Sequence, residues 1–449
     1  MTITLDKKNT TDGLIKIKVT EADYQSKVEE KTRDYARKAN IKGFRAGKVP
    51  TGVIKKMFGK SILVDEINHF LSHKLSDYIK ENNLKIIGEP IPNREKADLI
   101  DWETQKDFEF EYQIGIAEDF KYELSSKVKV KSYPIEIDEK VINETIADLK
   151  KRFGKVEYPE TSIAGDNLFG SIASQNEDGF KNESAIIDTD KIVKKEQSKF
   201  AGLKKGDEVS FDIQKIFDDP SQTAQLLDVS EEVAKKTSGK YTFKVDNISR
   251  TEPATINQEL FDRVFGKDAV KSEEEFTAKV KETIGQNYKR ESDYFLEHHI
   301  EDHFINNTKI NLPENFLKIW LKDTSDGKVT DEVLTKEFDA YTRNLKWDLI
   351  KNKIAEDSKI TVETEEVKER AKEVIVSQFG GAAFAEQLQD KLDAIAENYL
   401  SHEKGQNFMR LYTQLRNDKI MKHIRENITV VDKAVSVEEF KKIVQEHKH

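Results

Sequence analysis

The residues best suited to bind a charged partner are concentrated between positions 31 and 60. Ten cations stand in this stretch against one acid, Asp34, although the whole chain carries a net charge of −10. They are Lys31, Arg33, Arg37, Lys38, Lys42, Arg45, Lys48, Lys55, Lys56 and Lys60. Because a solvated helix face normally mixes both signs, this composition predicts a local site for an anionic partner, nucleic acid first. A basic face that is only solvated is the alternative.

The centre of this stretch is the segment Ile41–Pro50, with the sequence IKGFRAGKVP. Two glycines and a proline give it an unusual backbone, and Phe44 beside Arg45 offers a stacking group next to phosphate-binding charges. We therefore expect this loop to bind a ribonucleoprotein. The alternative is an ordinary tight turn with Phe44 packed inward.

The same loop does not have the spacing of a nucleotide-binding loop. That pattern needs four residues between its glycines and Ser or Thr after the lysine. Here three residues separate Gly43 from Gly47, and Val49 follows Lys48. The chain has no GxSxG segment, and its 84 acidic residues offer no pair that stands out as general acid and base. Without cysteine there are no disulfides, thiolate metal sites or cysteine nucleophiles. We expect no nucleotide hydrolysis and no cofactor.

Three histidines form the segment HHIEDH, at His298, His299 and His303, on a predicted helix. His299 and His303 are one turn apart, as zinc ligands can be. A metalloprotease would need Glu directly after the first histidine, and Ile300 stands there instead. We expect helix-surface histidines and no metal site.

The elements that must position the basic loop belong to a mixed α+β unit that ends near residue 117. Alternation at Ile15, Ile17 and Val19 predicts a strand, and Thr20 with Asp23 predicts the start of a helix. Its apolar face carries Tyr24, Val28, Tyr35 and Ala39. A second apolar stripe over 63–78 predicts another helix after the loop, and alternation over 108–116 predicts a strand. We expect the sheet to be antiparallel.

The predicted secondary structure changes twice along the rest of the chain. Residues 118–160 carry a short strand and a helix that ends at Gly154, and we expect a connector there. Residues 161–250 show short strands and turns, with a more helical insertion over 220–238, and predict a mostly-β domain. Long amphipathic helices after Pro253 predict an elongated all-α domain over 251–449. The predicted fold is α+β and multidomain, and its first domain spans 1–117.

Composition agrees with this division. Charged residues make up 35% of the 449 and hydrophobic residues 37%, which indicates a large wet surface and disfavours a single compact enzyme. The start, MTITLDKKNT, lacks the apolar segment of a signal peptide, and no run of about 18 apolar residues occurs. We expect no membrane segment and a cytoplasmic location.

The loop GFRAGKVP (43–50) resembles the ribosome-binding signature GFRxGKxP of the bacterial trigger factor family. The matching residues are Gly43, Phe44, Arg45, Gly47, Lys48 and Pro50. Ala46 stands where the family usually has proline. Later segments are also similar to the family: QELFDRVFG (258–266), LPENFLKIWL (312–321) and WDLIKNKIAEDSKITVETEEV (347–367). The resemblance therefore extends along nearly the whole chain.

This resemblance implies an ATP-independent chaperone that docks near the nascent-chain exit of the large ribosomal subunit and shields new polypeptides. By the same resemblance, Phe44, Arg45 and Lys48 contact the exit-tunnel protein and rRNA, and the helical domain holds the nascent or unfolded client. Whether the free protein forms a homodimer stays open.

The middle domain resembles the prolyl isomerase domain of FK506-binding proteins (FKBPs), in the turn Gly202–Val209 and the strand Tyr241–Val245. Catalysis there needs an aromatic cage around the proline ring. The segments Lys194–Lys199 and Ile186–Asp188 lack the aromatic residues of such a cage. We expect a kept fold with weak or no isomerase activity. The alternatives are a working peptidyl-prolyl isomerase whose helices deliver substrates, and a general RNA-binding or ribosome-assembly factor.

Overall fold

The computed structural model describes residues 1–45, 47–176, 179–379 and 391–447, and these form two compact units. The first unit contains Met1–Ser132 and Phe295–Val431, and the second contains Tyr133–Tyr294 and the residues from Asp432 onward. Each unit is thus built from segments that are far apart in the sequence.

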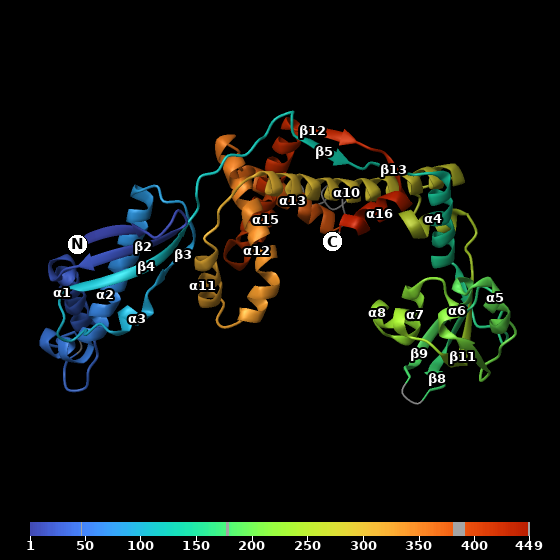
Figure 1. Ribbon diagram of the computed structural model, residues 1–449, viewed down its shortest axis with the longest axis horizontal. Coiled ribbons are helices and arrows are strands. Elements are labelled where there is room, and N and C mark those ends of the chain that lie inside the picture. The colour runs from blue at the N-terminus through green and yellow to red at the C-terminus, as the bar shows by residue number, and fades with distance from the viewer. Residues whose placement is uncertain (46, 177–178, 380–390, 448–449) are drawn as a thin grey trace. The chain divides into compact units, whose positions relative to one another are not determined.

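An antiparallel sheet of four strands forms the N-terminal part of the first unit (Figure 1). The strands are β1 (Thr2–Lys7), β2 (Asp12–Val19), β3 (Ile86–Pro92) and β4 (Phe108–Ile116), in the order β1-β2-β4-β3. Ile15, Ile17 and Val19 are fully buried, so the predicted alternation is confirmed. β1 was not predicted, because Ile3 and Leu5 alone make only a short alternation.

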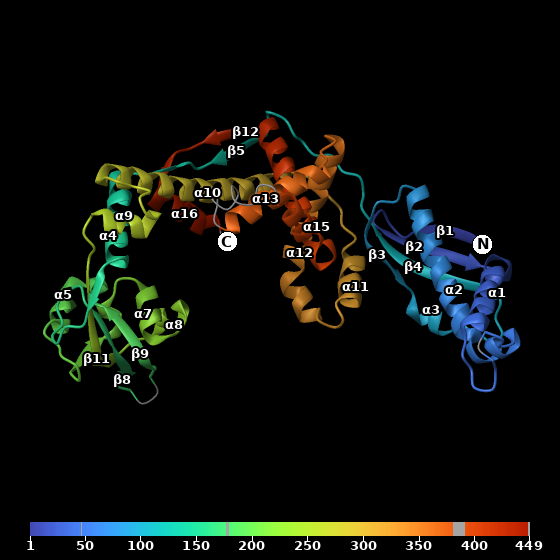
Figure 2. The same ribbon diagram turned by 180° about the vertical axis from the view of Figure 1, so that it is seen from behind.

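Two helices, α1 (Glu21–Lys38) and α2 (Thr51–Glu81), cover one face of this sheet (Figures 1 and 2). The predicted start of α1 is confirmed, since the backbone N–H and the hydroxyl of Thr20 both donate to the Asp23 carboxylate, at 2.8 and 2.7 Å. The ring of Tyr24 packs on Phe108 with centroids 5.8 Å apart. A short helix, α3 (Arg94–Asp98), precedes β4.

The prediction that Tyr35 lies on the buried face of α1 is wrong, because its side chain is 48% exposed. The apolar cluster against the sheet includes Tyr24 and Val28 but reaches no farther along α1. The last turns of α1 pack instead through Ala36 against α2. Tyr35 therefore lies past the sheet, on a surface that α1 and α2 share.

The first unit continues with helices from the last third of the chain. They are the part of α10 (Glu273–Asn307) from Phe295 onward, α11 (Glu314–Thr324), α12 (Asp331–Asp357), α13 (Thr364–Phe379) and α15 (Leu392–Asn427). Strand β5 (Lys129–Ser132) pairs with β12 (Thr429–Asp432) beside them. Buried residues of α10, α12 and α15, among them Ile300, Ile350 and Ile420, form one apolar cluster.

The second unit contains a strand-rich domain whose sheet has the order β10-β11-β8-β9, with β7 also paired to β11. The strands are β7 (Lys155–Glu157), β8 (Asn167–Ser174), β9 (Lys181–Asp188), β10 (Glu208–Asp212) and β11 (Lys240–Glu252). The short helices are η1 (Thr189–Lys191), α5 (Lys194–Gln197), η2 (Ser198–Phe200), α6 (Ile213–Ile216), α7 (Pro220–Leu227) and α8 (Glu231–Lys236). The predicted mostly-β region and its helical insertion are both confirmed.

The remainder of the second unit is mainly helical. It contains β6 (Ile135–Glu136), α4 (Glu139–Arg152), α9 (Gln258–Phe265), the first part of α10, β13 (Val435–Ser436) and α16 (Val437–His447). Phe261 of α9 stacks on Phe276 of α10 with ring centroids 4.9 Å apart. This pair lies in an apolar cluster that also takes side chains of α4.

The region after residue 250 is largely helical, as predicted, but it is not all-α. It also supplies β12 and β13, which pair with β5 and β6 of the predicted connector. Extended connector backbone needs hydrogen-bond partners, and these short strands provide them. None of the described helices combines the length and apolarity that crossing a membrane requires.

Candidate functional site

The basic loop between α1 and α2 is anchored at both ends by apolar contacts. Val49 is 5% exposed and lies in a cluster with Ala36 of α1 and Ile54 of α2. Ile41, at the other end of the loop, packs against the same cluster. The helices therefore fix where the loop begins and ends, while the residues between the anchors stay outside the core.

The loop backbone uses its glycines in conformations that other residues rarely adopt. Gly43 has φ of 97° and Gly47 has φ of 73°. The N–H of Phe44 donates to the carbonyl of Ile41 at 3.0 Å, and the N–H of Lys48 donates to that of Arg45 at 2.9 Å. A Cβ at Gly47 would lie 3.1 Å from the backbone oxygen of Arg37. Two tight turns therefore give the loop a defined shape.

The side chains of Phe44, Arg45 and Lys48 are open to solvent. Phe44 is 40% exposed, and Arg45 and Lys48 are also exposed. The alternative of an inward-facing Phe44 is thus wrong. Pro50 directly precedes the first turn of α2 with φ of −62°. Ala46 lies outside the described residues.

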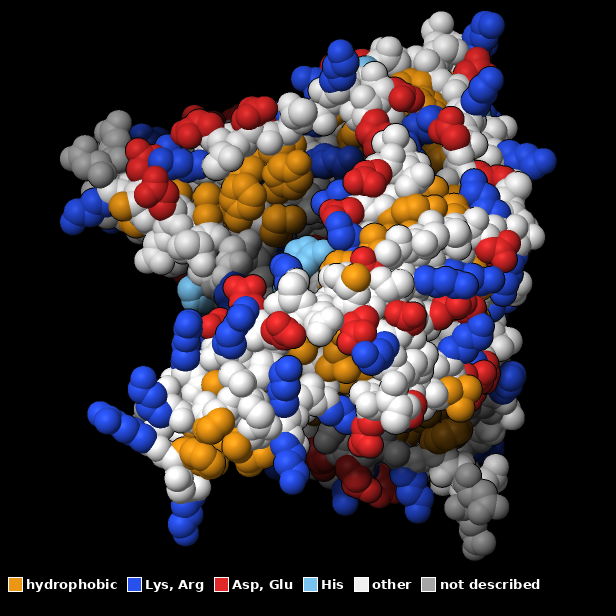
Figure 3. Space-filling model, turned by 90° about the vertical axis from the view of Figure 1, so that its left-hand side faces the viewer, with side chains coloured by type: hydrophobic (Ala, Val, Ile, Leu, Met, Phe, Trp, Pro, Cys, Tyr) orange, Lys and Arg blue, Asp and Glu red, His pale blue; other side chains and the backbone are white. Residues whose placement is uncertain are grey.

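Most cations around the loop have no acidic partner. Lys31 pairs with Glu66 at 3.3 Å and Arg37 with Asp34 at 3.7 Å. Within the part of the chain that the structure describes, no ion pair joins the others of the ten: Arg33, Lys38, Lys42, Arg45, Lys48, Lys55, Lys56 and Lys60. Figure 3 shows hydrophobic side chains bordered by Lys and Arg at the lower left of its face.

The helix ends add to this positive field. α2 starts at Thr51 with no acidic residue in its first turn, so the partial positive charge of its N-terminus is not neutralised there. Backbone N–H groups at such an end favour anions. The loop, its cations and this helix start together form a surface suited to a negatively charged partner.

Three exposed residues next to this surface were not predicted as part of it. Tyr35 is 48% exposed, Met57 55% and Phe58 36%, and the rings of Tyr35 and Phe58 lie 6.0 Å apart. A usable signal was present in the sequence, since Met57 and Phe58 stand between Lys56 and Lys60. Large apolar residues inside a run of cations indicate a binding surface rather than a core face.

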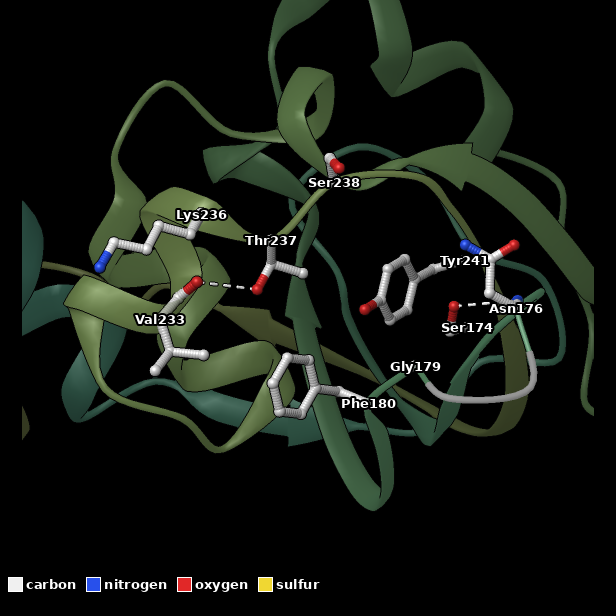
Figure 4. Close-up of a pocket in the computed structure, with 9 residues that line it drawn as sticks. All are labelled: Ser174, Asn176, Gly179, Phe180, Val233, Lys236, Thr237, Ser238 and Tyr241. Atoms are coloured by element: carbon white, nitrogen blue, oxygen red, sulfur yellow. Dashed lines mark hydrogen bonds between the residues drawn. The ribbon is translucent and has the colours of Figure 1, made fainter.

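The strand-rich domain has an open pocket of about 550 Å³ between the β8–β9 hairpin and α8. Its lining residues are Ser174, Asn176, Gly179, Phe180, Val233, Lys236, Thr237, Ser238 and Tyr241. Figure 4 shows the hydroxyl of Tyr241 directed into the space between Thr237 and Phe180. Because Phe180 is 41% exposed and Val233 37%, the pocket opens to water. Its lining has two aromatic rings and does not form a dry aromatic cage.

The interior of this domain is filled. Leu226 and Leu227 of α7 are 1% and 2% exposed, and they lie in one cluster with Ile187 and Phe243 of the sheet. The amide of Asn182 on β9 donates to the backbone oxygen of Leu226 at 2.9 Å, which ties α7 to the sheet. α7 therefore occupies apolar space over the sheet with its own side chains.

The two segments that lack the aromatic residues of an isomerase cage lie in a short helical stretch and at the end of β9. The segment Lys194–Lys199 forms α5 and most of η2, and Lys194 and Lys195 are exposed. Ile187 is buried, whereas Ile186 is 52% exposed. The predicted turn is confirmed, with Gly206 at φ of 93° and its N–H donating to Val245 at 2.7 Å.

The histidines of the HHIEDH segment lie on α10, as predicted. The Nδ1 of His299 is 3.1 Å from the backbone oxygen of Lys131, and the amide of Asn307 donates to the backbone oxygen of His303 at 2.8 Å. Among the described residues, no group of three or more His, Cys, Asp or Glu has the arrangement of a metal site.

Comparison with known proteins gives one family along the chain. The model for bacterial trigger factor protein matches residues 1–149, that for the probable trigger factor FKBP-like domain matches 156–253, and that for the probable trigger factor C-terminal domain matches 292–444. The trigger factor of Pelagibacter ubique is 25% identical over 462 residues, which cover 100% of this chain and 90% of the relative. That of Agrobacterium fabrum is 25% identical over 454 residues, covering 95% and 88%.

A solved structure titled "Promiscuous Substrate Recognition in Folding and Assembly Activities of the Trigger Factor Chaperone" is also similar. Its identity is 17% and its TM-score 0.42, with 95% of this chain and 100% of that chain covered, a likeness too low to carry an argument. The three family models, in family order and together spanning most of the sequence, show that this chain belongs to the trigger factor family.

Proposed function

We propose that this protein is a ribosome-associated, ATP-independent chaperone that docks through the loop Gly43–Pro50 near the nascent-chain exit of the large subunit. The family to which it belongs supplies the ribosome and the nascent chain as partners. The observation that carries the docking site is the loop itself: exposed Phe44 stands directly before Arg45, and neither Arg45 nor Lys48 pairs with an acid among the described residues.

The loop residues have distinct roles in this proposal. Arg45 and Lys48 bind phosphate groups of rRNA or acidic side chains of a protein at the exit, and Phe44 supplies an apolar contact beside Arg45. Gly43 and Gly47 set the turns, and Pro50 fixes the exit of the loop into α2. Counterion release from the RNA then makes the affinity depend on salt.

The largely helical region is proposed to hold the client. Within its described residues, Ile319 of α11 is 47% exposed and Met409 of α15 59%, and such exposed apolar side chains can contact an unfolded chain. Many weak contacts of this kind release a client without hydrolysis. The proposed division of the chain keeps 1–117 for docking, 118–160 as connector, 161–250 as FKBP-like domain and 251–449 for clients, in a cytoplasmic protein.

The FKBP-like domain is proposed to have weak or no isomerase activity. Support comes from the filled interior behind α7 and from an open pocket in which the described lining has two aromatic rings, Phe180 and Tyr241. Proline isomerisation is accelerated when the twisted amide is held in a dry site, which this pocket does not offer. Efficient catalysis of a proline-limited refolding reaction by this protein would contradict the proposal.

Co-sedimentation with bacterial ribosomes tests the docking proposal. We expect the unaltered protein to pellet with ribosomes and the variant Phe44→Ala/Arg45→Ala/Lys48→Ala to stay in the supernatant. If both pellet equally, the loop is not the docking site. A sizing experiment on the free protein decides separately whether it forms a homodimer.

A further inference from the structure

An exposed apolar patch lies beside the loop, where the last turns of α1 meet the first turns of α2. It is formed by Tyr35, Met57 and Phe58. Met57 is the most open of the three, at 55%, and Tyr35 follows at 48%. None of the three belongs to the buried clusters of this unit. Burying a large apolar side chain stabilises a complex by about 1.5–3 kcal/mol, so a partner that covered this patch would bind more tightly.

The patch is bordered by cations at helical spacing. Lys38 is three residues after Tyr35, Lys55 is three before Phe58, and Lys60 is three after Met57. All are exposed. No carboxylate of the described residues forms an ion pair with them, although Asp101 interacts with Lys60 over a longer distance. The patch is therefore an apolar centre with a positive rim.

This charge pattern selects the occupant. In a twofold dimer whose axis passed through this patch, each positive rim would face the same rim of the second copy, which is repulsive. An anionic partner is attracted instead. Met57 has no aromatic face on which a base could stack, and the rings of Tyr35 and Phe58 already lie against each other at 6.0 Å. A flexible thioether suits an apolar protein surface better than a nucleic acid.

We propose that Tyr35, Met57 and Phe58 form a second, apolar contact of the docking surface, which receives a hydrophobic side chain from an acidic surface of a ribosomal protein. This rests on the proposed docking function and deepens it. The loop supplies the salt-dependent part of the affinity, and the patch supplies a part that salt does not screen. Docking then has two separable components on one face of the N-terminal domain.

The experiment measures the affinity of the full chain for ribosomes at about 0.1 and 0.3 M salt. The test variant is Tyr35→Gln/Met57→Gln. Glutamine is polar and compatible with a helix, so it removes the apolar surface at these exposed positions without breaking α1 or α2. The matched control is Leu99→Gln, because Leu99 is 84% exposed and belongs to the same domain but to neither α1 nor α2. A third variant, Lys48→Ala, reports on the electrostatic component. Thermal unfolding of each variant confirms an intact fold.

We expect Tyr35→Gln/Met57→Gln to bind about tenfold more weakly at both salt concentrations with an unchanged salt slope. Leu99→Gln should bind like the unaltered protein, and Lys48→Ala should reduce the salt slope by about one. Binding of the patch variant at the original affinity would overturn the inference.

Other results would also overturn the inference, and they differ in what they say of the docking function. If Met57→Gln alone is neutral and Tyr35→Gln carries the whole loss, the patch stacks on RNA. If the patch variant loses only self-association, a second copy is the occupant. If the Phe44→Ala/Arg45→Ala/Lys48→Ala variant also binds normally, the docking function itself fails; if only that variant loses binding, docking stands and the apolar contact alone fails.

Discussion

The loop surface of the N-terminal domain and the interior of the FKBP-like domain use the same residue types in opposite ways. Around the loop, Phe44 and the patch residues are exposed, and Arg45 and Lys48 have no acidic partner among the described residues. In the FKBP-like domain, Arg250 donates twice to the Asp166 carboxylate, at 2.8 and 2.9 Å, and Asp166 is fully buried. Its leucines and phenylalanines are likewise packed inside.

This difference separates surfaces kept for a partner from interactions kept for the fold. An exposed cation without a partner contributes little to stability, whereas a buried carboxylate needs its partner to stay folded. Changes at the loop should therefore alter docking and leave stability unchanged. Changes inside the FKBP-like domain should do the reverse.

The largest expected effect on stability comes from Leu227→Ala in the FKBP-like domain. Leu227 is 2% exposed, and removing a buried leucine costs about 2–5 kcal/mol of unfolding free energy. Ribosome affinity should stay unchanged, because the docking loop is in the other unit. Calorimetry and ribosome binding on the same sample check both halves. A loss of docking without loss of stability would break the comparison.

The variant Gly47→Val should have the opposite outcome. At φ of 73°, with the Cβ position 3.1 Å from the Arg37 oxygen, a β-branched residue must distort the turn. We expect roughly tenfold weaker ribosome binding with little change in thermal unfolding, since a strain of about 1–2 kcal/mol can be relieved by rearranging an exposed loop. Gly327→Val is a control, because Gly327 also has a positive φ, 80°, with nothing within 4 Å of its Cβ position, but lies between α11 and α12, outside the docking loop. Equal affinities of the two variants would mean that the turn is unimportant.

The smallest effect concerns acid stability of the sheet that supports α1 and α2. Glu111 on β4 is 7% exposed and accepts from Lys96 at 2.5 Å and from Asn93 at 3.2 Å. The hydrogen bond from Lys96 is the main reason that the pKa of Glu111 is below its usual value of 4.5, although burial opposes this.

A lowered pKa stabilises the folded state above the usual value, and this stabilisation is lost as pH falls through the folded-state pKa. Unfolding of the first unit should therefore become easier as the pH falls below about 4.5. We expect Glu111→Gln to have a flatter stability profile as the pH falls below about 4.5, measured by denaturant unfolding. If stability depends on pH in the same way in the variant and in the unaltered protein, groups other than Glu111 cause the loss of stability in acid.

Much of the fold could be predicted because local patterns and tertiary packing agree. The strand β4 has the bounds given by its alternation, and Thr20 with Asp23 forms the cap that its spacing predicted. Tyr35 was misplaced because helical periodicity identifies a face but not how far a sheet extends beneath it. β12 and β13 were missed because pairing partners more than 290 residues away leave no local signal.

The candidate site was only partly predictable for a similar reason. The loop residues Gly43 to Pro50 carry a distinctive sequence, and the exposure of Arg45 and Lys48 follows from their charge. The patch of Tyr35, Met57 and Phe58 combines residues from two helices, which only the packing of α1 on α2 brings together. That Leu226 and Leu227 fill the interior of the FKBP-like domain could not be predicted, because it depends on where α7 packs on the sheet.

The most direct test compares two matched triple variants in one titration of ribosomes. The loop variant is Phe44→Ala/Arg45→Ala/Lys48→Ala, and the control is Phe180→Ala/Lys194→Ala/Lys195→Ala, which removes one exposed aromatic ring and two exposed lysines from the FKBP-like domain. We predict that the loop variant loses roughly a hundredfold in affinity while the control stays within about twofold of the unaltered protein. Equal losses, or none in either variant, would contradict docking through this loop.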